Sequence, residues 1–324
     1  MSKKLIIKGS IAALCCFAVA SCNKAAQSGK EDDVRFSVAL ETGVSTKVDG
    51  LGEAGSVDKL DVFVYDAAGN YMPTIVPAVT KIDGTHYSVT MRLLNNVKYH
   101  FVFFAQKSGT YAYSTDRKSI TLDYSAIPAN RDAYDAFFAH INDYTVSGDF
   151  NTPVTLRRPF AQINFGSVKA DYLAAEASKV AFDASLQTSI VAEKVPSVLN
   201  LLTGEASVPV KAVFQAAPYM GSVAGSGTLT VNSTPALSAD QLPVRYMEMA
   251  YVLAGDTQAN LDKVTLQLSG KQNGNAFSSV REVTNVPVRR NYRTSIVGNM
   301  FTGAAQFTVT IAPAFQTPDY RKDF

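Results

Sequence analysis

Cys22 is the residue whose surroundings point most directly to a chemical event, because the segment before it has the anatomy of a secretory signal. Three lysines open the chain, residues 9–20 form a short apolar run, and the small residues Ala20 and Ser21 stand just before the cysteine. The run is too short for a membrane-spanning helix, which needs about 20 residues. We therefore expect residues 1–21 to be a signal peptide, whose removal leaves Cys22 as the first residue.

The small residues before Cys22 also resemble the lipobox of bacterial lipoproteins. That resemblance implies cleavage before Cys22, acylation of its sulfur and its new N-terminus with palmitate-like chains, and attachment to the outer membrane. Since each buried CH2 contributes about 0.8 kcal/mol, several acyl chains on one residue would hold the protein firmly. An ordinary secretory signal that leaves a free thiol at Cys22 is the alternative.

The other cysteines add no chemistry to the mature chain. Cys15 and Cys16 both fall in the segment that is removed, so Cys22 alone remains. No internal disulfide can then form, although export would favour one. A catalytic thiol and a cysteine metal site are excluded as well.

The titratable residues form no recognisable catalytic or metal-binding pattern. His86, His100 and His140 stand far apart, and none has a partner at zinc-ligand spacing. The acids between residues 58 and 66 lack the spacing of a calcium loop. The sequence contains no nucleophile elbow, P-loop or dinucleotide-binding glycine motif. We therefore expect no enzyme activity, no metal and no cofactor.

The charge of the chain gives no reason to expect a nucleic-acid partner. The whole chain carries 30 basic and 28 acidic residues, and residues 1–21 take away three lysines and no acid. The mature chain thus has a formal charge of about −1 at reference ionisation states. It has no Lys/Arg block that could follow a phosphate backbone.

From residue 34 onward, apolar and polar residues alternate as they do in half-buried strands. Residues 264–268 and 307–311 show this pattern clearly, while residues 99–104 are apolar on both faces, as in a covered central strand. Further strands are expected at 34–41, 60–65, 87–94, 154–156, 160–165, 208–214, 228–231, 245–253 and 281–288. Residues 130–140 and 169–180 look helical. Many short strands with few helices predict an all-β fold of β-sandwiches.

The chain is long enough for two domains with sizeable cores. Residues 22–33 are small, polar and charged, so we expect a flexible tether there. Pro153 and Pro159 mark a joint, after which the strand pattern restarts. The sequence therefore predicts an N-terminal sandwich over residues 34–155 and a C-terminal sandwich over residues 156–324.

Four segments resemble the fimbrillin families of Bacteroidales, whose members build type V pili. They are 57–66 (VDKLDVFVYD), 99–105 (YHFVFFA), 157–166 (RRPFAQINFG) and 286–299 (VPVRRNYRTSIVGN), of which the last two are the most specific. The resemblance implies two tandem transthyretin-like, Ig-like Greek-key sandwiches with short connecting helices, in a lipoprotein precursor. It also implies a structural subunit of a cell-surface fimbrium that serves cell adhesion.

The same resemblance implies a mode of assembly by strand exchange between subunits. In these families a trypsin-like protease removes the first strand of the precursor, and the terminal strand of a neighbouring subunit fills the groove. Main-chain hydrogen bonds then hold the subunits together, and alternate side chains set the register. Here the inward side chains of the exchangeable strand and of the donor strand would be Phe36, Val38 and Leu40, and Phe307, Val309 and Ile311.

The processing site departs from the family pattern. No arginine lies between Phe36 and Met91, so Lys47 and Lys59 are the basic candidates after the first strand. Arg35 is expected ahead of the strand, where a cut would only release the tether. Either another protease uses Lys47, or the subunit keeps its first strand and stays in the membrane as an anchor or accessory subunit.

A surface lipoprotein that binds glycans or nutrients is the alternative function. Aromatic sugar-binding platforms favour Trp and Tyr, and this chain has 15 Tyr and 18 Phe but no Trp. Packing in strand cores accounts for most of these aromatic residues. The composition therefore weakens the glycan-binding interpretation and leaves it open.

Overall fold

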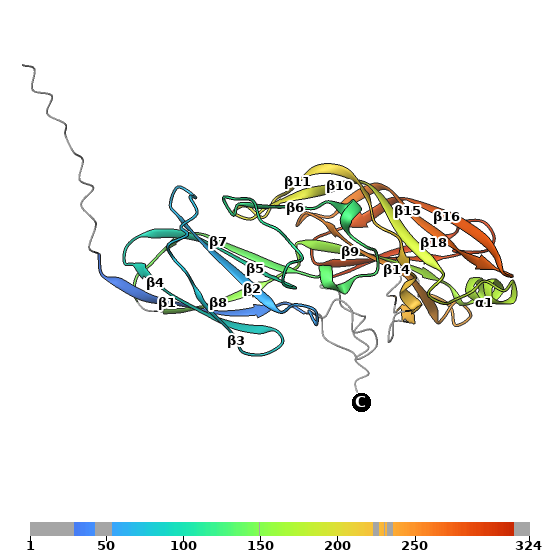
Figure 1. Ribbon diagram of the computed structural model, residues 1–324, viewed down its shortest axis with the longest axis horizontal. Coiled ribbons are helices and arrows are strands. Elements are labelled where there is room, and N and C mark those ends of the chain that lie inside the picture. The colour runs from blue at the N-terminus through green and yellow to red at the C-terminus, as the bar shows by residue number, and fades with distance from the viewer. Residues whose placement is uncertain are drawn as a thin grey trace, which may run out of the picture.

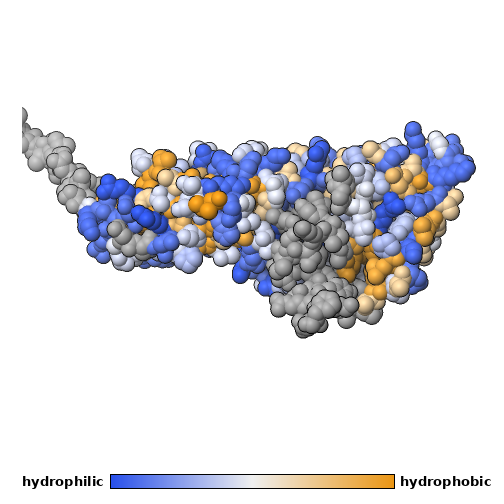
Figure 2. Space-filling model, turned by 90° about the horizontal axis from the view of Figure 1, so that it is seen from below, coloured by the Kyte–Doolittle hydropathy of each residue, from blue (hydrophilic) through white to orange (hydrophobic). Residues whose placement is uncertain are grey.

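A computed structural model describes residues 29–42, 54–148, 150–222, 227–229, 231 and 236–313. The described chain forms an elongated body in which two β-structures follow one another along the long axis (Figure 1). Hydrophilic residues cover much of the face seen in Figure 2, with apolar patches among them. The all-β sandwich prediction is confirmed, since the described elements are almost all strands.

The N-terminal structure has two sheets around one apolar core. One sheet has the order β3-β4-β1-β8, and the other has the order β2-β5-β7. Their bounds are β1 Glu31–Leu40, β2 Lys59–Asp66, β3 Ala78–Lys81, β4 His86–Leu94, β5 Lys98–Gln106, β7 Phe137–Thr145 and β8 Phe150–Leu156. The core contains the inward side chains of β1 and β4 together with Phe101 and Phe103 of β5.

The C-terminal structure is also built from two sheets. One has the order β11-β10-β15-β16, with β6 and β12 pairing with β10, and the other has the order β13-β14-β9-β17-β18. The bounds are β6 Ser119–Thr121, β9 Phe160–Ser167, β10 Gln187–Asn200, β11 Ala206–Val213, β12 Ala217–Pro218, β13 Thr228–Leu229, β14 Val244–Leu253, β15 Ala259–Gln272, β16 Asn275–Val288, β17 Tyr292–Gly298 and β18 Phe307–Pro313. Every residue of β9 is buried, including Gln162, Asn164 and Ser167, because the strand lies between β14 and β17 inside its sheet.

One of the two predicted helices is present and the other is wrong. Helix α1 (Lys169–Ala177) lies inside the predicted range 169–180. Residues 130–140 instead contain the single 3-10 turn η2 (Asp132–Tyr134) followed by the first residues of β7. Asn130 adopts a positive φ of 58° and accepts a hydrogen bond from the Met249 backbone N–H through its Oδ1 (2.7 Å), so long-range contacts override the local helical pattern. Two further 3-10 turns are η1 (Tyr124–Ala126) and η3 (Met220–Ser222).

The first strand begins earlier than the predicted tether allows. Residues 31–33, which the sequence assigns to the tether, belong to β1 and pair with the end of β4. Asp32 is buried, and its carboxylate accepts hydrogen bonds from the Asn95 side chain and from the Gly148 backbone N–H (3.0 Å). These contacts pull a polar segment into the sheet.

The boundary between two domains near residue 155 stays a prediction. Two apolar clusters do exist, one centred on β1, β4 and β5 and the other on the C-terminal sheets. Residues 111–129, however, precede the predicted boundary and contribute Tyr111, Ile120 and Tyr124 to the second cluster. This segment crosses to the C-terminal structure, where β6 pairs with β10.

Glu248 on β14 places an ionisable carboxyl group in the middle of the second core. Its side chain is fully buried, its Oε2 accepts a long hydrogen bond from Asn130 Nδ2 (3.5 Å), and no described group bonds its Oε1. Burial raises the pKa of Glu248 to about 8, against the lowering effect of hydrogen bonds from Thr188 and Asn130. The carboxyl is therefore protonated in the folded protein at neutral pH.

This burial predicts a pH-dependent stability. Folded Glu248 holds its proton up to about pH 8, while the unfolded chain loses it above its usual pKa of 4.5, so stability falls as pH rises through this window. Between pH 5 and pH 8 the free energy of unfolding of the parent should fall by about 3 kcal/mol more than that of Glu248→Gln. Urea denaturation at several pH values measures both curves, and parallel curves would contradict the assignment.

Candidate functional site

Strand β1 is amphipathic along its whole length. Buried and exposed side chains alternate from Glu31 to Leu40. Phe36 and Val38 are each 1% exposed and Leu40 is 5% exposed, so these three predicted inward residues do face the core. The Phe36 ring packs edge-on against Phe101 and Phe103, with centroids 5.0 and 5.1 Å apart.

Both edges of β1 are paired with other strands. It runs antiparallel to β4 and parallel to β8, so that Phe36 lies opposite Val89 on one side and Thr152 on the other. Among the described strands, β8 joins this sheet through β1 alone. Removing β1 would therefore leave two strand edges with unpaired backbone groups and an open apolar core between them.

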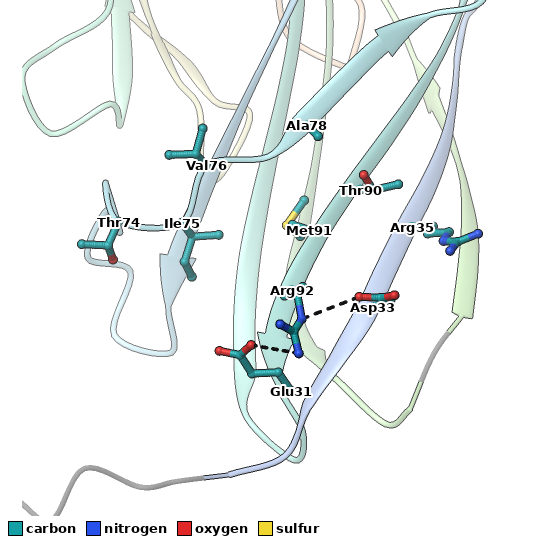
Figure 3. A pocket seen from close by; sticks show the side chains of 10 residues that line it. All are labelled: Glu31, Asp33, Arg35, Thr74, Ile75, Val76, Ala78, Thr90, Met91 and Arg92. Atoms are coloured by element: carbon teal, nitrogen blue, oxygen red, sulfur yellow. Dashed lines mark ion pairs between the residues drawn. The ribbon is translucent and has the colours of Figure 1, made fainter.

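The outer face of β1 is charged and lines a shallow hollow of about 660 Å³. Figure 3 shows Arg92 of β4 next to Glu31 and Asp33, with Ile75 and Val76 on the loop that leads to β3. Arg92 forms ion pairs with Glu31 (3.4 Å) and Asp33 (3.9 Å). The strand thus presents apolar side chains to the core and charged side chains to solvent.

The predicted position of Arg35 is wrong. The processing prediction treats Arg35 as lying ahead of the strand, although the expected range 34–41 includes it, and in the structure it is the fifth residue of β1 and pairs with Thr90 and Asn151. The strand extends back to Glu31 because the acids there find partners on β4 and on nearby loops. Proteases cut exposed loops, and backbone that is paired on both edges is a poor substrate, so the position of Arg35 in β1 does not favour a cut there while the chain is folded.

Two other predicted sites lie outside the described residues. These are the lipid attachment residue Cys22 and the candidate processing residue Lys47. Lys47 belongs to the segment between Thr42, just after β1, and Ala54, just before β2. It therefore stands on the connection that joins the first strand to the rest of the fold.

The candidate donor strand β18 lies at the opposite end of the chain and in the other core. It pairs with β17 at the edge of its sheet, and Phe307, Val309 and Ile311 are half-buried there. Phe307 and Val309 pack against the second core. The structure thus does not bring the two predicted strands together within one molecule, because they belong to different sheets.

A junction between the two cores contains polar residues that sequence reasoning missed. Arg158 and Asp135 form a fully buried, bidentate ion pair, with Nε–Oδ1 and Nη2–Oδ2 distances of 2.7 and 2.9 Å. The Arg158 guanidinium also lies over the Phe137 ring, 4.3 Å from its centroid. Arg158 does fall in the conspicuous segment 157–166, but no local pattern identifies Asp135 as its partner.

Within the described residues, no three or more His, Cys, Asp or Glu side chains gather where they could hold a metal ion. None of the helices in the described part of the chain is long and apolar enough to cross a membrane.

The packing of β1 can be tested by comparing how two substitutions at neighbouring positions change the free energy of unfolding. Phe36→Ala removes a buried ring and should lower the free energy of unfolding by about 3–5 kcal/mol. Arg35→Ala, on the exposed face of the same strand, should change it by about 0.5 kcal/mol or less. Urea denaturation compares the two, and equal losses would show that β1 is not packed as described.

Comparison with known proteins gives one family and several distant structures. Residues 26–323 match a family of unknown function (DUF6562), and no curated protein matches. A candidate cell adhesion protein from Bacteroides uniformis has a TM-score of 0.47 at 11% identity, over 88% of this chain and 98% of that one. A fimbrial protein from Bacteroides vulgatus has 0.44 at 13%, over 86% and 99%.

The tip fimbrial protein Mfa3 from Porphyromonas gingivalis is a similar case, with a TM-score of 0.42 at 11% identity, over 87% of this chain and 99% of that one. At such scores the likeness carries no argument about function, which must rest on the strands of the chain itself.

Proposed function

The chain belongs to the DUF6562 family, and we propose that it is a structural subunit of a cell-surface fimbrium, exported as a lipoprotein and assembled by β-strand exchange. The observation that carries the proposal is the position of β1. This strand is first in the described chain, is paired on both edges and fills the N-terminal core. A single cut in the segment 43–53 would separate it from the rest of the fold.

The physics of the proposed assembly is addition of a foreign strand to an open groove. With β1 gone, β4 and β8 would offer unpaired N–H and C=O groups, and the pockets of Phe36, Val38 and Leu40 would be empty. An extended segment from another subunit satisfies both needs, through main-chain hydrogen bonds and alternate side chains. An open groove is otherwise prone to aggregation, so the cut would act as the switch for assembly.

The sequence of β18 supports its role as the donor. Residues 36–40 read FSVAL and residues 307–311 read FTVTI, so both strands place Phe, Val and a branched aliphatic residue at every second position. A strand running in the direction of β1 would place Phe307 in the Phe36 pocket and Val309 in the Val38 pocket. The polar residues between them would face solvent.

Two fates of β1 fit this proposal. A cut after Lys47 would give a subunit that begins at Val48 and accepts a neighbour's strand, as in a fimbrial shaft. An uncut subunit would keep β1 and its acylated Cys22, and would serve as an anchor or accessory subunit in the outer membrane. In either case β18 would have to leave β17 before it could act on a neighbour.

Strand exchange is tested by treating the purified protein with a trypsin-like protease and looking for ladders on non-heated gels and for filaments by electron microscopy. The parent should form ladders after the cut. Val309→Asp should reduce them at least about tenfold, because a carboxylate cannot enter an apolar pocket without cost. Val280→Asp, at a residue of β16 that is 53% exposed, is the control and should assemble normally.

A parent protein that is fully cut yet stays monomeric would contradict the proposal. Equal ladders from Val309→Asp and from the parent would argue against β18 as the donor strand.

Lipid attachment is tested by labelling cells with palmitate and by sequencing the N-terminus of the protein recovered from their surface. The label should reach the parent and be lost in Cys22→Ala. An acylated Cys22 at the N-terminus identifies an uncut subunit, and a start at Val48 identifies a trimmed one. Protein that never takes up the label in any fraction would contradict the lipoprotein assignment.

A further inference from the structure

The C-terminal end of β1 is tied to residues beyond its own core. Glu41, the residue after β1, donates its backbone N–H to the Leu156 carbonyl (2.8 Å). Its carboxylate accepts hydrogen bonds from Arg157 Nε (2.5 Å, to Oε2) and from Asn291 Nδ2 (3.0 Å, to Oε1). Asn291 lies in the turn between β16 and β17. One side chain therefore connects the end of β1 to the C-terminal structure.

The buried ion pair between Arg158 and Asp135 supports the same end of the strand. Arg158 Nη1 donates a hydrogen bond to the Glu41 carbonyl (3.3 Å), and Asp135 Oδ2 accepts one from the Ala54 backbone N–H (3.4 Å). The pair thus contacts the chain on both sides of the segment 43–53. Every one of these contacts lies outside that segment, so a cut within it breaks none of them.

We propose that Glu41 is a latch that keeps β1 seated after the chain is cut, so that cleavage and strand release are separate steps. This rests on the proposed function in treating β1 as the strand to be exchanged and in placing a cut in the segment 43–53. A nicked subunit would stay folded and closed, since β4, β8 and the core still hold β1, and the parting of Glu41 from Arg157 and Asn291 would be the first step of release. Its groove would then open only when release is due, which limits the time in which bare strand edges can aggregate.

The ion pair between Glu41 and Arg157 is exposed enough to break and form again in solution. The side chains of Glu41 and Arg157 are 28% and 67% exposed, so their ion pair is open to solvent and is weakened by salt. The Asn291 contact adds a charge-assisted hydrogen bond from the C-terminal structure. Release of β1 should therefore become faster as the salt concentration rises.

The test uses the full-length chain with a unique protease site in place of residues 44–50. After the cut, native mass spectrometry follows the loss of the N-terminal fragment from the isolated monomer. Glu41→Gln should lose the fragment about tenfold faster than the parent, and Arg157→Gln should do the same. High salt should speed release from the parent and have little effect on either variant.

Glu31→Gln is the matched control, because it removes the same charge from the other end of β1, where Glu31 pairs with Arg92 (3.4 Å). Its release rate should stay within about twofold of the parent. The latch is overturned if Glu41→Gln and the parent release at one rate, if the parent fragment leaves at once, or if no variant releases it. The release measurement uses the isolated monomer and needs no partner subunit, whereas the ladder assay measures assembly. If the release rates follow the prediction but the cut protein forms no ladders, the fimbrial proposal is refuted and the latch is not.

Discussion

The pairing of β1 on both of its edges is the constraint on which the N-terminal structure depends. β8 reaches its sheet through β1, and four side chains of β1 fill the core, namely Val34, Phe36, Val38 and Leu40. Burial of each such side chain contributes about 1.5–3 kcal/mol. The strand is nevertheless first in sequence and leads to β2 through one connection. A strand that places four side chains in the core is thus also the one that a single cut separates.

Local pattern predicts the strands that matter most here. Alternation identifies both β1 and β18, and residues 99–104, which are apolar on both faces, identify the covered central strand β5. It does not identify β10, because Glu193, Lys194 and Pro196 interrupt the apolar pattern. The structure absorbs this interruption in a bulge between Ala192 and Val195, with Lys194 at a φ of 59°.

The junction and the turn before β7 are decided by partners that are distant in sequence. Asp135 looks like an ordinary helix residue until Arg158, 23 residues later, is placed against it. Glu41 and Asn291 are 250 residues apart, and although Asn291 falls in the segment 286–299, no local pattern identifies Glu41 as its partner. Such long-range polar contacts produce no periodic pattern in the sequence. Composition and spacing therefore predict the sandwich fold but not these contacts between distant residues. A buried pair also costs desolvation, so the pair of Arg158 and Asp135 is weak evidence for added stability.

The loop before the candidate donor strand β18 is held in place by one buried carboxylate. Asp171, buried in the first turn of α1, accepts hydrogen bonds from the backbone N–H groups of Met300 (2.6 Å) and Thr302 (2.8 Å). Gly303 follows at a φ of 67°, a conformation that glycine adopts at low cost. In the proposed exchange, motion of β18 would therefore begin after Thr302, while Asp171 keeps the preceding loop on the body. Glu41 and Asp171 then have parallel roles, because each fixes the chain just beside a strand that the assembly requires to move.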